Sequence, residues 1–547
     1  MRSEKKFLIL LLALILFSAI SVQAQIASYK YFYRVYFKDK GSYSVNDFQP
    51  SQLLSQRAIN RRQKAGIAVP VLSDLPVYSS YLSQIESIGF TLNNTSKWQN
   101  TGLFMTSDAA DISPLLNLSF VKDVKVVKRP VAKGSSSDKL NFSTEQTLST
   151  AYDNPVAMLN GTALHNSGYD GKGILIAILD GGFYQADLAS SLASLRNRGG
   201  IIAMRDFVSG GSFVFGYHNH GTAVLSVLAG IATGEIEGSA PGADYCLLRT
   251  EDTFSEFPVE EDFWAAGAEF ADSIGADIIS SSLGYYAFDD TTMSYKFSAM
   301  DGHTTFVTRA AEAAASKGIL VITSAGNERT NAWCRIIAPT DGDSVLSAGA
   351  VDGYNIISSF SSAGPSASGR IKPDNVAQGV SVPVQVSEST FTRANGTSFS
   401  CPLLSGICAC AMQAVPMAIN MDIIEALHIN GDKAASPDSL YGFGLPDMAG
   451  VILTLENKYV RIPESEATIG PNPFWGPLSV LFREQPGSIE LEIYNISGKA
   501  IARRSYPDYL SRTLEINDLI NSGQGLYFIR VKTASKTITF KVSKINR

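Results

Sequence analysis

A serine in a polar turn is the first residue of this sequence whose surroundings suit chemistry. Ser398 lies in the stretch Asn-Gly-Thr-Ser-Phe-Ser-Cys-Pro, and an apolar run of small residues follows over residues 403–415. The run predicts a buried helix, whose first turn accepts Pro402 because that position has no intrahelical N–H bond to lose. At a helix start, backbone N–H groups and the helix dipole favour negative charge beside the hydroxyl. Ser398 is therefore a candidate nucleophile, although a serine that merely caps a core helix fits the same pattern.

A nucleophilic serine needs a base, a group that orients the base and donors for an oxyanion. One candidate for each lies upstream. His220 precedes a run of small and apolar residues and would lie at the entry of a buried helix. Asp180 ends the apolar run 173–179, and two glycines follow it. Asn327 follows another apolar run and Ala-Gly, so its side-chain N–H could point at a developing oxyanion.

Each of these residues also has a simpler interpretation. His220 could be a structural histidine at a helix entry, and Asn327 could be a turn residue. His218 and His220 could together bind a metal ion, but the chain has only five histidines and no third ligand is spaced nearby. The site residues therefore include no predicted metal ligand.

Apolar runs alternate with helix-like segments through the middle of the chain. Such runs are typical of parallel strands that are covered on both faces. The strand-like runs are 173–179, 245–248, 276–280 and 319–324, and the helix-like segments include 259–274 and 305–317. The alternation predicts an α/β domain with a parallel sheet. In such sheets the site lies at the carboxyl ends of the strands, which is where Asp180 is placed.

A smaller pattern precedes this domain. A strand-like stretch at 31–37, a polar helix-like segment at 49–66 and alternating stretches at 90–93 and 121–128 predict a small α+β unit. The unit has no clustered acid, base or nucleophile. The polar stretch 133–138 after it predicts an exposed linker, which would be open to proteolytic processing.

The last part of the chain has a third pattern. Apolar and polar residues alternate over four segments, with a turn at 495–499 between the second and the third, and the segments are 478–482, 489–494, 526–531 and 537–542. This alternation predicts a small all-β sandwich.

Length, charge and the N-terminus set broad limits. The 547 residues, 45% of them hydrophobic, predict more than one domain, and the net charge of -6 without a basic stripe argues against a nucleic-acid partner. The five cysteines are few and odd in number, so no disulfide framework is predicted. Residues 1–24 combine a basic start with an apolar run and predict a signal peptide that is cleaved before Gln25. A membrane anchor is the alternative, but the run is short for a span.

The four candidate residues and their neighbours resemble one known family. Asp180 in Ile-Leu-Asp-Gly-Gly, His220 in His-Gly-Thr, Asn327 in Ala-Gly-Asn-Glu and Ser398 in Gly-Thr-Ser occur in the order acid, base, serine. That order and those motifs resemble the subtilisin-like serine endopeptidases over residues 151–450. The resemblance implies that Ser398 attacks the scissile carbonyl, His220 transfers the proton and Asp180 orients the imidazole. It also implies that Asn327 and the Ser398 backbone N–H hold the oxyanion.

The same resemblance assigns the residues that would bind the substrate. The edge strand that pairs with an extended peptide corresponds to Ser282, Leu283 and Gly284, and one wall of the specificity pocket corresponds to Ser324, Ala325 and Gly326. Ile337 would narrow this pocket, which predicts a preference for small side chains before the scissile bond. Calcium often supports the family's fold, but no acidic loop identifies such a site here, so no cofactor is assigned.

Two positions depart from the family's usual motifs. Ala223 stands where a second histidine usually follows His-Gly-Thr, and Leu403 stands where a histidine usually follows the proline. Neither position carries chemistry in this mechanism. Activity is therefore expected, with a difference only in helix packing.

The resemblance extends to both flanking units. The first resembles an inhibitory pro-domain that assists folding, and the last resembles the sorting domain of type IX secretion cargo, with Pro-Asn-Pro at its start and Gly-Leu-Tyr-Phe-Ile-Arg-Val near its end. The predicted order is signal peptide 1–24, pro-domain 25–138, catalytic domain 150–455 and sorting sandwich 469–547. An adhesive or carbohydrate-binding module is the alternative for the sandwich.

Together these features predict a serine endopeptidase that is made as a zymogen and hydrolyses peptide bonds through an acyl-enzyme. Its expected partners are protein or peptide substrates, its own pro-domain and the type IX secretion machinery. It would be secreted or attached to the cell surface after export through the periplasm and the outer membrane. The alternative is an inactive adhesin or scaffold on the same fold.

Overall fold

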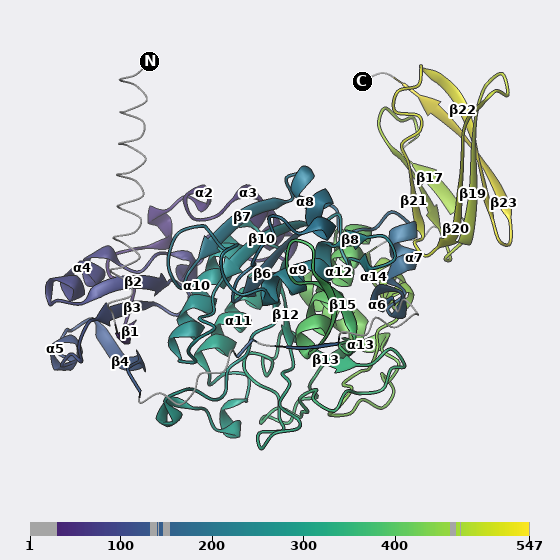
Figure 1. The fold of residues 1–547 in the computed structure, drawn as a ribbon. Helices are drawn as coiled ribbons and strands as arrows, with labels where there is room; N and C mark the ends of the chain where they lie inside the picture. The colour runs from purple at the N-terminus through teal and green to yellow at the C-terminus, as the bar shows by residue number, and fades with distance from the viewer. Residues whose placement is uncertain are drawn as a thin grey trace, which may run out of the picture.

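The computed structural model describes residues 30–131, 139–140, 142–145, 154–459, 467–470 and 472–545. The predicted signal peptide and the predicted linker 133–138 lie outside these ranges. Within them, no helix is both long enough and apolar enough to cross a membrane. Figure 1 shows an N-terminal unit, a large central domain and a β-rich tail beside helices α7 and α14.

The central domain is built on a seven-stranded sheet in which every neighbouring pair of strands is parallel. This arrangement confirms the predicted α/β class. The strand order is β14-β13-β12-β11-β6-β10-β7. The strands are β6 (Leu175–Asp180), β7 (Ile201–Asp206), β10 (Asp244–Arg249), β11 (Ile278–Ser281), β12 (Leu320–Ser324), β13 (Val345–Val351) and β14 (Asn375–Gln378).

Strand β6 is wholly buried because helices cover both faces of the sheet. Ile176 and Ile178 share one core with residues of α9 and α12, whereas Leu175 and Leu179 share the opposite core with residues of α10 and α11. Successive side chains of a strand point to opposite faces, so a fully apolar strand suits a sheet covered on both sides. The helices are α9 (His220–Ala229), α10 (Val259–Ile274), α11 (Phe306–Ser316) and α12 (Thr397–Ala414).

Helix α12 places Ser398 in its first turn, as predicted, but it differs from its prediction at Pro402. The helix begins at Thr397, so Pro402 lies inside it rather than in the first turn. Proline has no N–H, so the carbonyl of Ser398, four residues earlier, loses its intrahelical donor. The hydroxyl of Ser282 replaces that donor at 2.9 Å. A side chain after β11 thus supports the helix at the residue that carries the candidate hydroxyl.

The N-terminal unit is a four-stranded antiparallel sheet in the order β2-β3-β1-β4, packed against short helices. Strand β3 was not predicted, because its continuous apolar pattern shows no alternation. The structure explains the pattern, since Phe104 faces the unit's own core while Leu103 and Met105 join a core shared with Phe263 of α10. The elements are β1 (Tyr31–Phe37), α2 (Pro50–Leu53), α3 (Gln56–Lys64), α4 (Ser79–Ser87), β2 (Thr91–Ser96), β3 (Thr101–Thr106), α5 (Ser113–Leu116) and β4 (Val121–Lys128).

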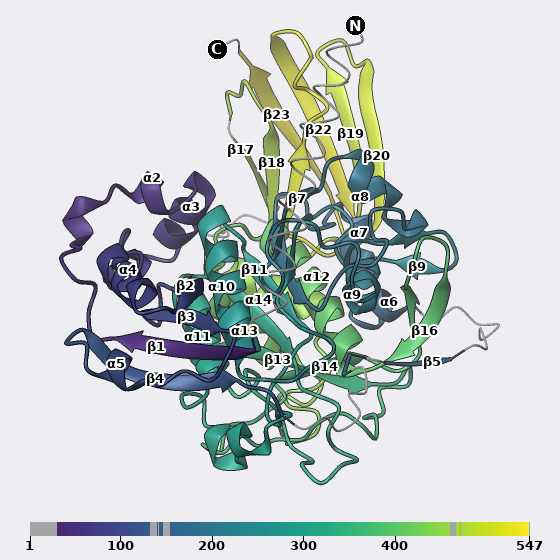
Figure 2. The ribbon, with the colours of Figure 1, turned by 60° about the vertical axis from the view of Figure 1, so that its left-hand side comes forward.

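Buried charges join this unit to helix α10, beside which it lies in Figure 2. Arg34 donates to Asp262 at 2.5 and 2.8 Å, and Asp272 accepts from both Arg61 and Arg62, the latter at 2.5 Å. All five side chains are at most 5% exposed. A buried charge is tolerated only when it is paired and hydrogen-bonded. These pairs therefore fix how the unit sits on α10.

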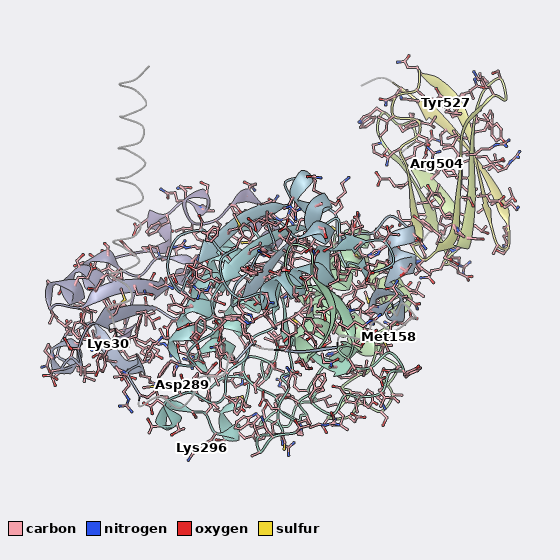
Figure 3. The ribbon with its side chains drawn as sticks, in the orientation of Figure 1. Lys30, Met158, Asp289, Lys296, Arg504 and Tyr527 are labelled. Atoms are coloured by element: carbon pink, nitrogen blue, oxygen red, sulfur yellow. The ribbon has the colours of Figure 1, made fainter. Side chains whose placement is uncertain are left out.

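The tail is a sandwich of two antiparallel sheets, in the orders β17-β18-β21 and β20-β19-β22-β23, as predicted. Strand β20 was missed because it is mostly exposed and rich in charge. Figure 3 labels Arg504 of this strand and Tyr527 of β22, which belongs to the same sheet. A buried pair between Arg512 and Glu456 of α14 ties the sandwich to the central domain. The elements are α14 (Met448–Tyr459), β17 (Ala467–Gly470), β18 (Leu478–Phe482), β19 (Gly487–Asn495), β20 (Ala500–Tyr509), β21 (Thr513–Ile516), β22 (Gly525–Thr533) and β23 (Thr537–Lys544).

The buried pairs on α10 give a first prediction. In the full-length protein, Asp272→Asn leaves Arg61 and Arg62 without their shared carboxylate, so we expect a loss of about 3–5 kcal/mol in the free energy of unfolding. Urea unfolding measures it. Asp108→Asn, at an exposed position of the same unit, is the control and should lie within about 0.5 kcal/mol of the parent. An unchanged midpoint for Asp272→Asn would show that the interface does not depend on these pairs.

Candidate active site

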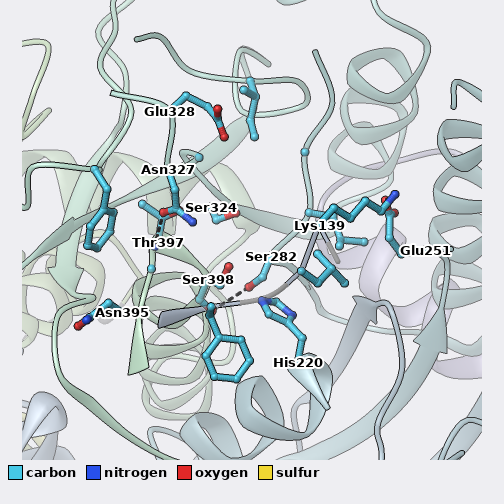
Figure 4. Close-up of a pocket in the computed structure, with 18 of the residues that line it drawn as sticks. Lys139, His220, Glu251, Ser282, Ser324, Asn327, Glu328, Asn395, Thr397 and Ser398 are labelled. Atoms are coloured by element: carbon cyan, nitrogen blue, oxygen red, sulfur yellow. Dashed lines mark hydrogen bonds and ion pairs between the residues drawn. The ribbon is translucent and has the colours of Figure 1, made fainter. Parts of the chain in front are cut away.

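A pocket of about 320 Å³ lies at the carboxyl edge of the sheet. It brings together side chains that are far apart in the sequence, from the ends of strands β11 and β12 and the starts of helices α9 and α12 (Figure 4). The predicted site residues that line it are His220, Ser282, Leu283, Gly284, Ser324, Gly326, Asn327 and Ser398. Ala325 is buried behind the pocket wall rather than lining it.

Asp180 and His220 form a buried pair behind this pocket. Nδ1 of His220 lies 2.9 and 3.0 Å from the two carboxylate oxygens of Asp180. Asp180 is fully buried at the end of β6, His220 is 2% exposed at the start of α9, and the N–H of Gly181 donates to Asp180 at 2.7 Å. A carboxylate can only accept, so the proton resides on Nδ1 and Nε2 is left to act as a base.

Ser398 is the second residue of α12, where backbone N–H groups have no intrahelical partner. Its side chain lines the pocket that also holds His220 (Figure 4), while the hydroxyl of Ser282 donates to its carbonyl. Gly396 precedes the helix with φ 152°, a conformation that glycine supports best. The chain can thus turn sharply from β16 (Phe391–Asn395) into the helix.

The amide of Asn327 has a fixed orientation. Its oxygen accepts from the backbone N–H of Thr397 at 2.9 Å and from the Thr397 hydroxyl at 3.0 Å. The amide NH₂ group is therefore turned away from Thr397 and toward the open pocket, as Figure 4 shows. The sequence did not single out Thr397, because its role depends on a contact 70 residues away.

Ile337 lies between the two predicted substrate walls. A methyl group added at Gly284 would collide with Ile337, and one added at Gly326 would lie 3.0 Å from it. Ile337 is 7% exposed and lines the pocket. Its position agrees with the narrow pocket that the sequence suggested.

The chain's own segment 139–145 also reaches this pocket, which sequence reasoning missed. Leu140, Phe142 and Ser143 line it, and the ring of Phe142 lies 5.8 Å from that of His220. Strand β5 (Ser143–Glu145) pairs with β16 in antiparallel fashion. The segment therefore covers the candidate catalytic residues.

One group of side chains among the described residues has the spacing of a cation site, and it consists of Glu251, Glu256 and Glu260. Neither histidine of the motif around His220 belongs to it. His218 instead accepts a hydrogen bond from the N–H of His220 at 3.1 Å.

A parallel α/β domain with a serine, a paired histidine and an amide at its carboxyl edge defines a class of serine hydrolase, and comparison with known proteins gives the family. Residues 171–444, half of the chain, match the subtilase family, so the chain belongs to that family. Residues 32–147 match the peptidase S8 propeptide domain of Bacteroidota, and residues 468–545 match the secretion system C-terminal sorting domain. The propeptide match extends past the predicted boundary at residue 138.

Individual relatives match the central domain. The chain is 28% identical over 291 residues to M-protease of Shouchella clausii (strain KSM-K16), covering 53% of this chain and 67% of that protein. It is also 28% identical over 291 residues to Subtilisin Savinase of Lederbergia lenta, covering 53% and 94%. The solved structure of MycP1 from Mycobacterium smegmatis matches 59% of this chain and 90% of its own, at 18% identity and a TM-score of 0.45.

The protein is therefore a serine endopeptidase that carries a propeptide and a sorting domain. The sorting domain indicates export, followed by secretion or attachment to the cell surface.

The contact between Thr397 and Asn327 gives a second prediction. Thr397→Val removes one of the two hydrogen bonds that fix the amide, so we expect kcat to fall about three- to tenfold with little change in KM, because one hydrogen bond is worth about 1 kcal/mol. Steady-state hydrolysis of a peptide substrate measures this. Thr390→Val, on an exposed turn, should leave kcat unchanged. Equal loss in both variants would contradict the role of Thr397.

Proposed function

We propose that the enzyme hydrolyses peptide bonds through an acyl-enzyme on Ser398, with His220 as the base and Asp180 as its orienting group. The observation that carries this proposal is the buried Asp180–His220 pair, which faces the same pocket as a serine at the start of an 18-residue helix. The three side chains come from β6, α9 and α12, and each lies at the end of an element that is packed in the core.

In this mechanism the hydroxyl oxygen of Ser398 attacks the substrate carbonyl while Nε2 of His220 takes its proton. Asp180 keeps the imidazole in the required tautomer and stabilises its charged form. The oxyanion is held by the amide of Asn327 and by the backbone N–H of Ser398, with the positive end of the α12 dipole behind them. His220 then gives the proton to the leaving amine, and a water molecule activated by the same base hydrolyses the ester.

The substrate would lie extended along the pocket. Ser282, Leu283 and Gly284 supply backbone groups for pairing. Ser324 and Gly326, with Ala325 buried behind them, form one wall of the pocket for the residue before the scissile bond. Because Ile337 lies between Gly284 and Gly326, this residue is expected to be small.

The enzyme is made as a zymogen in this proposal. The proposed division is signal peptide 1–24, pro-domain 25–138, catalytic domain 150–455 and sorting domain 469–547. The segment 139–145 supports inhibition by the enzyme's own chain, because it occupies the pocket that a substrate would need. The proposed partners are protein or peptide substrates, the pro-domain itself and the type IX secretion machinery.

Loss of the nucleophile tests both parts of this proposal. We expect the secreted wild type to lose the N-terminal unit and to hydrolyse peptides, and Ser398→Ala to keep the unit and to be inactive. Ser389→Ala, at an exposed position, is the control. Intact mass, N-terminal sequence and peptide hydrolysis are measured together. If both chains are cut alike but only the wild type hydrolyses peptides, another protease does the processing. If the wild type does neither, the protein is an inactive scaffold.

Removal of the oxyanion donor is the next prediction. We expect Asn327→Leu to lower kcat by about 10²–10³-fold with a nearly unchanged KM, the range known for loss of this kind of donor in a subtilisin. Asn197→Leu, at the exposed end of α8 (Ala193–Asn197), is the matched control. A fall in kcat/KM that comes mainly from a higher KM would instead assign Asn327 to substrate binding.

A further inference from the structure

Three glutamates meet at one end of the active-site pocket. Glu251 follows β10, Glu256 lies in the next loop, and Glu260 belongs to the first turn of α10; Glu251 and Glu256 line the pocket that also holds His220 and Ser398. One carboxylate oxygen from each lies within 4.8 Å of the others. Their side chains are 3%, 21% and 0% exposed, respectively. Like charges so close and so little hydrated are stabilised by a cation between them.

The cation present is the ammonium group of Lys139. Its Nζ lies 2.5 Å from Glu251 and 2.7 Å from both Glu256 and Glu260, and it also donates to the carbonyl of Ser255 at 2.8 Å. The glutamates outweigh the effect of burial and hold the pKa of Lys139 well above its ordinary value. Burial raises the pKa of Glu256 to about 8 and that of Glu260 well above its ordinary value, so both carboxyl groups are stabilised in their charged form by a positive neighbour.

Two of the glutamates, Glu251 and Glu260, are held by the catalytic domain rather than by the propeptide. The hydroxyl of Tyr285 donates to Glu251 at 2.8 Å, and the N–H groups of Asp252 and Phe257 donate to Glu260 at 2.8 and 3.1 Å. These donors remain when the N-terminal segment leaves. Glu251 and Glu260 are thus preorganised to receive another cation in place of Lys139.

A lysine or arginine side chain fits this site better than a metal ion does. Calcium takes six to eight oxygen ligands. Tyr285 and the backbone N–H groups of Asp252 and Phe257 instead place hydrogen-bond donors beside these carboxylates. Oε1 of Glu256 is buried and has no hydrogen-bond partner among the described residues. The guanidinium of an arginine, which has five N–H donors, could reach this oxygen as well as the others.

The course of segment 139–145 relates this site to the bond that would be cut. Leu140 lies against Gly181, next to Asp180, and Phe142 contacts the rings of His220 and Phe399. Leu140 and Phe142 thus both lie beside the candidate catalytic pair. For a bond cleaved between these two residues in sequence, Lys139 is the second or third residue on its N-terminal side.

We propose that Glu251, Glu256 and Glu260 form a subsite that binds a lysine or arginine side chain of the substrate, two or three residues before the cleaved bond. Lys139 fills this subsite in the uncut chain. The inference rests on the proposed function and adds the substrate class to it. A small residue at the bond and a basic residue upstream would then mark the preferred substrates.

The test uses the processed enzyme and fluorogenic peptides that differ only at the four positions before the cleaved bond, with Lys, Arg, Met or Glu at each. We expect kcat/KM for Lys or Arg to exceed that for Met by about 10- to 100-fold at the second or third position, since a charged hydrogen bond is worth about 1.5–3 kcal/mol. Glu256→Gln should reduce the ratio of kcat/KM for the Lys peptide to kcat/KM for the Met peptide at least threefold. Glu256→Lys should shift the preference in kcat/KM from the Lys and Arg peptides toward the Glu peptide.

Glu256 is chosen because it is the most exposed of the three, so its variants are the best placed to fold, and Glu235→Gln at an exposed position is the matched control. Equal rates for Lys and Met peptides, or a preference that survives Glu256→Gln, would overturn the inference. A lysine preference that disappears with added calcium chloride and returns with a chelator would also overturn the inference, since the three glutamates would then be a metal-binding site. A wild type that cleaves no peptide would instead contradict the proposed function.

Discussion

The fold of the zymogen depends on neutralisation of the buried negative charge on one helix. Helix α10 carries Glu260, Glu261, Asp262, Glu269 and Asp272, and every one of them is at most 7% exposed. Their cationic partners, Arg34, Arg61, Arg62 and Lys139, all belong to the N-terminal 139 residues. Glu269 is met there by a hydroxyl and two backbone N–H groups instead. Because an unpaired buried carboxylate is strongly unfavourable, the burial of these side chains in the zymogen depends on the partners that the propeptide supplies.

The catalytic groups depend on a second, more local constraint. Pro402 removes the intrahelical donor for the carbonyl of Ser398, and the hydroxyl of Ser282 replaces it. The same turn of helix supplies Thr397, which orients Asn327. The candidate nucleophile, the candidate oxyanion donor and the start of the proposed substrate-binding edge are therefore connected through hydrogen bonds to two adjacent residues of α12. A displacement of one of these groups therefore changes the position of the others.

The elements and site residues that could be predicted are those that show in hydrophobic periodicity or in local sequence motifs. The buried strands show as apolar runs, and α10 could be bounded correctly because its helical segment is long. The start of α12 at Ser398 was predicted to within one residue, but Pro402 was wrongly placed in the first turn, because its compensating contact with Ser282 cannot be read from the sequence. The glutamate cluster was missed as well: Glu251, Glu256 and Glu260 are unremarkable in sequence as a solvated acidic stretch, and only folding shows that they are buried around one lysine.

The zymogen contacts fall into two sets with different consequences after a cut. The ion pairs of Arg34, Arg61 and Arg62 lie on α10, outside the pocket, and a cut within segment 139–145 leaves them intact. Lys139 lies inside the pocket, at the subsite that substrates would need. Under the proposed function, the cleaved propeptide thus stays bound through α10 with its last residues in place as a product. Because buried pairs are screened little by salt, its departure requires opening of the α10 interface rather than a change in ionic strength. Activation is then limited by release of the propeptide, and the cut alone does not free the site.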